Sequence, residues 1–513
     1  MSSTPSPCLP PSPIQSEKAK RYDRQLRLWG DHGQSSLERA SICLVNATAT
    51  GTEILKSLVL PGLGSFTILD PAAVSGEDAG SNFFLTGDSV GQSRGEVAAR
   101  LLLEMNHEVR GDCRQDTVEN ILEAEPDFLN SFTLVIACGC SDKTLSLLSS
   151  KLEAAKIPLL VVRTSGFFGY IRLQMSEHVI VETHPDNVAP DLRLDVPWPD
   201  LANWLEAEGK RMEVMDLKDH SHTPYPVIIY RQLQSWMENN NGKHPSNYKE
   251  KKQFREQMMK GVRKRENNEE VDEDEENFEE AGKAVNTVLV KTTIPSSTKT
   301  IIEDEQAENI SASSSNFWIL AHALRDFVSL EERLPVSGIV PDMFSDSERF
   351  IKLQNIYKDK ANQDAEIIGR KVAQVLESLG RGSDTISDIE VRRFCKEARY
   401  LRVIRGSSLS REFRSSGLSQ HLEDPDSDVL YYIVLRAVDQ YMSQFNVNPG
   451  MKMCRVLNRV QSPVDTSGLT EADIELDIGR LKTIISGMLT QIGVGSSVQG
   501  LDEHIHEVIR HNR

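Results

Sequence analysis

The loop at residues 46–51 and the acid Asp70 are the first residues whose types and spacing could do chemistry. The loop follows an apolar run and precedes a helical one, and Asp70 ends the next apolar run. This order is typical of a nucleotide-binding sheet, in which such an acid holds a ribose. A phosphate cradle needs glycines for its tight turn and close backbone approach. Asn46 and Thr48 stand where the first two glycines would be, and Gly51 alone remains. The pattern favours a nucleotide-binding fold that has lost its ligand.

Seven cysteines could supply thiols for metal binding or acyl transfer. Their odd number and scattered positions favour a reducing compartment, the cytoplasm or the nucleus, over a disulfide framework. Cys138 and Cys140 form a single C-x-C without a second pair, which is a poor zinc site, and we expect no metal to be bound. A thiol that accepts an acyl group needs a lowered pKa in an exposed, electropositive place. Cys395 beside Lys396 is a loose candidate, and a buried structural cysteine is the favoured interpretation.

Short apolar runs alternate with helical runs around this loop. Fully apolar strands that alternate with helices predict a parallel sheet buried on both faces. Beyond residue 164 two alternating runs, residues 170–175 and 179–182, predict an antiparallel hairpin. The predicted parallel strands are residues 40–45, 65–69, 132–137 and 158–162, and the helices between them are residues 52–60, 94–105 and 144–155.

The rest of the chain shows the periodicity of helices. Apolar residues recur at i, i+3 and i+4 in six runs, and the fold class is therefore α/β, a Rossmann-like domain with a large, mostly helical insertion. The six runs are residues 225–238, 316–330, 345–379, 386–398, 430–445 and 471–492. We expect four parts: a tail at residues 1–17, the Rossmann-like domain at 18–185, the insertion at 186–470 and a return to the first domain at 471–513.

Charge and hydropathy exclude two classes of partner. The formal net charge of −18 argues against a general nucleic-acid-binding protein, and no apolar run has the roughly 18 residues that a membrane span needs. Residues 249–265 carry eight basic side chains and residues 266–280 carry ten acidic ones. This pattern predicts a solvated helix that runs into an acidic loop at residues 266–280.

Different specific motifs are spread along the whole chain. They lie at residues 21–30, 46–56, 75–85, 184–187, 191–194, 220–224, 274–280, 341–343, 432–439 and 477–482. Together they resemble the ubiquitin-activating-enzyme (ThiF-like) family, and within it the branch of regulatory subunits of heterodimeric neddylation-activating enzymes. The resemblance covers residues 18 to 508.

The resemblance implies a pseudo-adenylation domain, interrupted by a helical domain that corresponds to the catalytic-cysteine domain. Such a chain is the non-catalytic, regulatory half of a heterodimer and binds no cofactor itself. Its catalytic partner subunit holds ATP, Mg and the thioester cysteine. Together they adenylate the C-terminus of the ubiquitin-like modifier of the neddylation (Rub) pathway, form its thioester and pass it to a conjugating enzyme, upstream of cullin modification.

The residues that active members of the family use are replaced here. Asn82 and Phe83 stand where active members have an Arg-Gln pair, and Arg94 stands in place of a lysine. The metal-binding acid falls near Asp142, and we expect Lys143 to crowd it. These substitutions agree with the loss of the glycines in the loop.

The resemblance gives Arg24 a role outside its own subunit, as an arginine contributed in trans to the partner's ATP site. A guanidinium suits that role because its rigid fork meets phosphate oxygens bidentately and keeps its charge. Without the resemblance, Arg21, Arg24 and Arg27 would be interpreted as one solvated face of a short helix. With it, we favour Arg24 as the trans contributor.

An apolar loop at residues 334–344 could be an ordinary buried connector, but the resemblance implies that it contacts the partner. The same two interpretations apply to a segment around His220, and the resemblance implies that it also contacts the partner. The residues implied in partner binding are His220, Val336, Ile339, Val340, Pro341 and Met343.

Two departures and two rival functions remain at this stage. Members of the family continue beyond the segment at residues 506–507 through a crossover helix and a last strand, whereas this sequence stops at Arg513, so we expect a C-terminal truncation. Residues 452–468 resemble extra sequence. The rivals are a scaffold of the same pathway that does not support activation, and a dinucleotide-binding oxidoreductase, against which the missing glycines weigh.

Overall fold

The computed structural model describes residues 17–183, 189–263, 275–414, 416–445, 449–450, 470–495 and 498–511, and it divides into two compact units. Unit 1 comprises residues 1–177 and 405–513, and unit 2 comprises residues 178–404. The sequence-based insertion, 186–470, differs from unit 2 chiefly at its end. The reason is that the helices between residues 429 and 511 pack in one core with the sheet of unit 1. The segment 452–468 lies outside the described residues.

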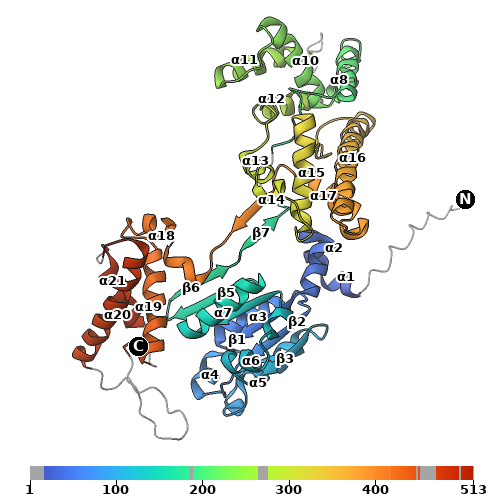
Figure 1. Cartoon of the computed structure of the whole chain (residues 1–513). Helices are drawn as coiled ribbons and strands as arrows, with labels where there is room; N and C mark the ends of the chain where they lie inside the picture. The colour runs from blue at the N-terminus through green and yellow to red at the C-terminus, as the bar shows by residue number, and fades with distance from the viewer. Residues whose placement is uncertain are drawn as a thin grey trace, which may run out of the picture. The chain divides into compact units, whose positions relative to one another are not determined.

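Unit 1 is built on a six-stranded sheet of order β3-β2-β1-β4-β5-β6 (Figure 1). The first five strands are parallel, and β6 runs antiparallel to β5 at one edge. The register aligns Ile42 of β1 with Phe66 of β2 and Leu134 of β4. The strands are β1 (Ser41–Val45), β2 (Ser65–Leu69), β3 (Arg110–Arg114), β4 (Leu134–Cys138), β5 (Leu159–Ser165) and β6 (Phe168–Gln174).

One sequence-based expectation about strands was wrong, and one strand was missed. The predicted hairpin of residues 170–175 and 179–182 does not form, because a tight turn with Gly166 at φ 57° returns the chain directly onto β5. Strand β7 (Glu177–Ile180) pairs instead with β8 (Arg402–Arg405). Strand β3 was missed because it lies at the sheet edge and is polar, so it lacks the apolar run of a central strand.

Alternation along the strands gives the sheet two apolar faces, each covered by helices. Ile42 and Leu44 pack with α3 and α5, whereas Cys43 and Val45 pack with α6, α7 and the C-terminal helices α19, α20 and α21. The helices of unit 1 are α1 (Glu17–Arg21), α2 (Asp23–Arg39), α3 (Ala49–Val59), α4 (Gly76–Ser81), α5 (Arg94–Met105), α6 (Val118–Ala124), α7 (Asp142–Ala155), α18 (Ser416–His421), α19 (Val429–Phe445), α20 (Glu471–Ile492) and α21 (Leu501–His511).

Unit 2 is helical and has α16 (Ser347–Ser378) as its longest element. Its 32 residues span roughly 48 Å at 1.5 Å per residue. Leu353 and Tyr357 belong to one apolar core, and Ile368 and Val372 belong to a second one further along the helix. The other helices are α8 (Pro199–Arg211), α9 (Leu217–Ser221), α10 (Tyr225–Asn239), α11 (Tyr248–Met258), α12 (Glu276–Val288), α13 (Ser296–Ile302), α14 (Glu305–Glu308), α15 (Asn316–Glu331) and α17 (Asp388–Lys396).

The acidic segment expected as a loop at residues 266–280 is helical at its end. Residues 276–280 open α12, because Phe278, Ala281 and Val285 form an apolar stripe that is buried. Residues 266–274 lie outside the described residues. Among the helices that the structure describes, none is long and apolar enough to cross a membrane.

Candidate functional site

The loop between β1 and α3 is held by its own side chains. Asn46 has a left-handed φ of 67°, and its side-chain Nδ2 donates to the carbonyl of Cys138 at 3.0 Å. Thr48 caps α3 by accepting a hydrogen bond from the Gly51 amide at 3.2 Å. The Ala47 amide donates to Asp70 Oδ2 at 2.8 Å. The amides of Ala47 and Gly51, in the stretch where a glycine-rich cradle would present amides to a phosphate, therefore have partners within the chain.

Asp70, the acid expected to hold a ribose, holds an arginine instead. Its side chain is 0 % exposed, and its two oxygens accept from Nε and Nη2 of Arg94 at 2.7 and 3.2 Å. Nη1 of Arg94 also contacts Asp78 Oδ1 of α4 at 3.0 Å. Burial alone would lower the pKa of Arg94, but its bonds to both acids raise that pKa above its ordinary value. Arg94 thus neutralises the end of β2.

Asn82 and Phe83 complete this filling. Asn82 is buried, and its Oδ1 accepts from the Thr52 hydroxyl at 3.1 Å and from the Phe84 amide at 3.0 Å. Phe83 is 75 % exposed, and the Lys56 ammonium lies 5.6 Å from its ring centroid. An amide and a phenyl ring supply no positive charge for a triphosphate, so neither residue can replace the missing Arg-Gln pair.

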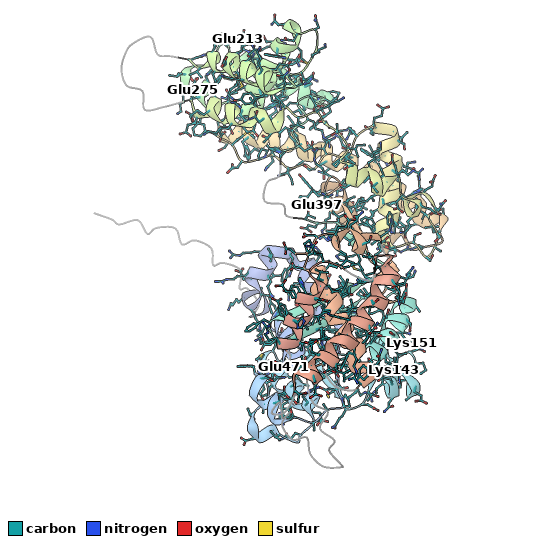
Figure 2. All side chains as sticks on the ribbon, turned by 90° about the vertical axis from the view of Figure 1, so that its left-hand side faces the viewer. Lys143, Lys151, Glu213, Glu275, Glu397 and Glu471 are labelled. Atoms are coloured by element: carbon teal, nitrogen blue, oxygen red, sulfur yellow. The ribbon has the colours of Figure 1, made fainter. Side chains whose placement is uncertain are left out.

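The position of the metal-binding acid is neutralised in the same way. Asp142 Oδ1 contacts Nη2 of Arg436 on α19 at 3.0 Å, and the same guanidinium contacts Glu412 and Asp439 at 3.1 and 3.3 Å. Burial alone would lower the pKa of Arg436, but the buried acids Glu412 and Asp439 raise it above its ordinary value. Lys143, which we expected to crowd this acid, is exposed on α7 (Figure 2).

These residues do not fit a bound nucleotide or divalent cation. Both acids that would meet a ribose or a metal already face arginines of the same chain. Within the described residues no group of three or more His, Cys, Asp or Glu side chains could hold a metal ion.

The cysteines in the described parts of the chain are not built for acyl transfer. All five are free thiols, and burial raises the pKa of Cys395 to about 12, that of Cys138 to about 12 and that of Cys113 to about 11. The pKa values of Cys43 and Cys140 are raised further, also by burial. Thiolates are scarce at neutral pH when the pKa is that high.

Arg24 lies near the amino ends of the parallel strands, whereas this loop lies at their carboxyl ends. Tyr22, at the start of α2, is 2 % exposed, and its hydroxyl accepts from Asn106 Nδ2 at 3.1 Å. Asn106 also donates to the carbonyl of Val59 at 2.8 Å, where α3 ends. Since α3 begins beyond the carboxyl end of β1 and ends before β2 starts, this anchor lies at the amino ends of the strands. Arg24 is therefore carried by a helix, α2, that lies far from the chain's own loop.

The three arginines expected on one face differ in their contacts. Arg27 pairs with Asp23 at 3.0 Å, and Arg21 donates to the carbonyl of Met105 at 3.2 Å. Arg24 is exposed, and among the described residues it has no hydrogen-bond or ion-pair partner. Its five donors therefore meet no acceptor within the described parts of the chain.

The loop at residues 334–344 is partly a buried connector. Val336 and Val340 are 1 % and 9 % exposed, whereas Ile339 is 52 % exposed, and Pro341 and Met343 are half-buried. Hydrogen bonds hold the backbone of the loop. Arg193 donates to the carbonyls at positions 334 and 335, and Asp364 accepts from the Val336 amide. A cavity of 220 Å³ within unit 2 adjoins it, lined mainly by Pro190, Ile294, Leu334, Ile339, Pro341, Cys395 and Tyr400.

His220 is in the core of unit 2. It is 3 % exposed, its Nδ1 lies 2.6 Å from Glu275 Oε1, and its ring stacks on Phe278 with centroids 5.5 Å apart. The other Glu275 oxygen accepts from the Arg263 amide at 3.0 Å; Glu275 is labelled in Figure 2. The buried ring supports Glu275 and the start of α12 and is not presented on the surface.

Sequence reasoning missed Arg436 and Asp78 as parts of the filled site. Arg436 and Asp142 are 294 positions apart in the chain, so no local spacing connects them. Asp78 had one usable signal, since Ser75 and Asp78 have the spacing of a capping box. That spacing does not indicate the ion pair between Asp78 and Arg94.

Comparisons with known proteins show the family to which this chain is related. Residues 22–188 match the ThiF family. The chain is 43% identical over 501 residues to the NEDD8-activating enzyme E1 regulatory subunit of Xenopus laevis, covering 96% of this chain and 90% of that protein. It is 44% identical over 504 residues to the Danio rerio protein of the same description, covering 97% and 90%, and 34% identical over 505 residues to the AXR1 subunit of Arabidopsis thaliana, covering 97% and 88%. The chain belongs to the family of NEDD8-activating enzyme E1 regulatory subunits.

Proposed function

We propose that this regulatory subunit supplies Arg24 to the ATP site of a catalytic partner subunit and binds no nucleotide itself. In this proposal the partner holds ATP and Mg, and the two chains together adenylate the C-terminus of the ubiquitin-like modifier. The partner's thiol then takes the modifier, and a conjugating enzyme receives it from the complex. The proposed compartments are the cytoplasm and the nucleus.

The observation that carries this proposal is the contrast between Arg24 and the filled loop. Asp70 and Asp142 are neutralised from within by Arg94 and Arg436. Arg24 is an exposed guanidinium on a helix that is anchored at the amino ends of the strands. An arginine placed there cannot reach the chain's own loop and is free for a phosphate of a neighbouring subunit.

The chemistry explains why an arginine would be useful there. When the modifier's carboxylate oxygen bonds to the α-phosphorus of ATP, the bond from that phosphorus to the pyrophosphate oxygen breaks. Negative charge moves onto the departing pyrophosphate, and a guanidinium already in place stabilises it. Removal of one such group commonly costs roughly 3 kcal/mol, or about a hundredfold in rate.

The test is ATP–pyrophosphate exchange by the purified heterodimer in the presence of the modifier. Arg24→Ala is expected to slow exchange about a hundredfold with assembly intact. Arg24→Lys should recover only part of the rate, because a point charge cannot reproduce the bidentate fork. Arg27→Ala is the matched control, since Arg27 forms an ion pair with Asp23 of its own chain. Equal, small effects of the two alanine variants would refute the trans role. No exchange by the wild-type pair would favour the scaffold alternative.

Two further parts of the proposal concern unit 2 and the thiols. The exposed Ile339 and the half-buried Pro341 and Met343 are the members of the loop that a partner could touch. Val336, Val340 and His220 would act only by supporting that surface, because they are buried. None of the chain's cysteines is proposed to carry the thioester.

A further inference from the structure

The segment that carries Arg24 is separated from the rest of α2 by a break at Gly30. Gly30 has φ 66° and ψ 179°, which are not helical values, and this conformation is open to glycine but strained for other residues. Residues 23–29 therefore form a helix of roughly two turns of their own. Because the helix is interrupted, the direction of this segment has to be fixed by the contacts that residues 21–29 make.

Tyr22 is the buried side chain at the start of this segment. Among residues 21–30, all of which the structure describes, Tyr22 alone is buried, at 2 % exposure. Its hydroxyl accepts from Asn106 Nδ2 at 3.1 Å and donates to Glu108 Oε2 at 3.3 Å. The same hydroxyl lies so close to Gly62 that a Cβ atom there would be 2.8 Å from its oxygen. The site that receives Tyr22 is therefore closely packed.

The residues that receive the Tyr22 hydroxyl are themselves fixed. Asn106 is 0 % exposed, and its Nδ2 also donates to the carbonyl of Val59 at 2.8 Å. Its Oδ1 accepts from the Glu108 amide at 3.3 Å. A buried side chain whose polar atoms all have partners is held in one arrangement. Tyr22 is therefore attached to a rigid part of unit 1.

The other hydrogen bonds from this segment to residues outside α2 are weaker. Arg21 donates to the carbonyl of Met105 at 3.2 Å in an exposed position, where water competes for both groups. Gln25 donates to the carbonyl of Pro61 at 3.4 Å, beyond the usual range of roughly 2.7–3.2 Å for such bonds. The position of Arg24 thus depends chiefly on Tyr22.

We infer that Tyr22 is a positioning residue for Arg24, because its buried hydroxyl sets the direction from which the guanidinium approaches a phosphate. This inference rests on the proposed function of Arg24. A bidentate guanidinium acts only when its two N–H bonds point at the phosphate oxygens, and a misplacement of about 1 Å can cost on the order of a hundredfold in rate. In this role Tyr22 touches no nucleotide and acts through Arg24.

Tyr22→Phe tests this role, since it removes the hydroxyl and keeps the buried ring. Arg21 and Gln25 still hold the segment, so we expect the rate of ATP–pyrophosphate exchange to fall about tenfold, against about a hundredfold for Arg24→Ala. The two effects should not multiply, because residues that act as a unit are not additive. Once Arg24 is alanine, Tyr22→Phe should change the rate no further.

The experiment measures exchange by the full chain with a saturating amount of the catalytic subunit, in the presence of the modifier. The cycle consists of the wild type, Tyr22→Phe, Arg24→Ala and the double variant. Tyr441→Phe is the matched control, because Tyr441 is 1 % exposed and its hydroxyl contacts Asp477 and Arg480 among the C-terminal helices of unit 1. Both phenylalanine variants should lower the melting temperature of the chain by a similar amount, but only Tyr22→Phe should slow exchange.

The outcomes separate this inference from the proposed function. Exchange by Tyr22→Phe at the wild-type rate overturns the positioning role, while slow exchange by Arg24→Ala then leaves the trans arginine standing. An equal loss from Tyr22→Phe in both backgrounds, or an equal loss for Tyr441→Phe, would also overturn it, because the loss would then not pass through Arg24. Exchange by Arg24→Ala at the wild-type rate overturns the proposed function and this inference with it.

Discussion

Replacement of Arg94 by alanine should destabilise unit 1 by about 3 kcal/mol. Asp70 is 0 % exposed and would lose the 2.7 and 3.2 Å contacts with the guanidinium, which leaves its charge buried. Breaking a buried pair from one side typically costs about 3–5 kcal/mol. The lower end applies here, because the amides of Ala47 and Ala72 still donate to Asp70 at 2.8 and 2.9 Å.

The measurement is urea unfolding, with amide hydrogen exchange in β1 and β2 to assign the loss to the sheet. Arg114→Ala is the matched control, because Arg114 pairs with Glu125 at 3.4 Å with both side chains about half exposed, and such a surface pair is worth at most about 1 kcal/mol. The double variant Arg94→Met, Asp70→Asn should lose less than Arg94→Ala, since no charge stays buried. Equal losses for Arg94→Ala and Arg114→Ala would refute the internal neutralisation of the site.

Three other predictions concern unit 2. Cys395 should resist alkylation at pH 7, because burial raises its pKa to about 12, and Cys395→Ser should leave the partner's thioester intact; loss of the thioester in a still-assembled complex would contradict this. Burial raises the pKa of Asp364, but its bonds to Arg333 outweigh burial and hold that pKa below its ordinary value. The pair therefore stabilises unit 2 above the unfolded pKa of about 3.9, and that stability is lost as pH falls through the lowered folded value; Asp364→Asn should flatten this part of the acid-unfolding curve. Glu275→Gln should cost about 1–3 kcal/mol through its contact with His220, and an unchanged melting temperature would be evidence against that contact.

Much of the fold followed from local patterns. The apolar runs around residues 40–45 and 65–69 became β1 and β2 because each is buried on both faces, and the periodic run at 345–379 became α16. The polar edge strand β3 and the pairing of β7 with β8 did not follow, because edge strands lack an apolar signature and long-range pairing leaves no local one.

The sequence predicted which residues of an active nucleotide site are missing here, but not the contacts that the replacing residues make. The substitution of Asn46 and Thr48 for glycines is visible in the sequence, and so is the replacement by Arg94. That Arg94 would pair with Asp70, or that Arg436 would pair with Asp142, depends on contacts between distant segments.

Calorimetric titration with ATP and Mg tests most directly whether the site of this chain is filled by its own arginines. The purified chain alone should give no binding heat in the low-micromolar range, because the acids and amides of its loop already have internal partners. The heterodimer should bind one ATP per pair of chains. Low-micromolar ATP binding by the isolated chain, or two ATP molecules per heterodimer, would contradict the assignment of all nucleotide binding to the partner.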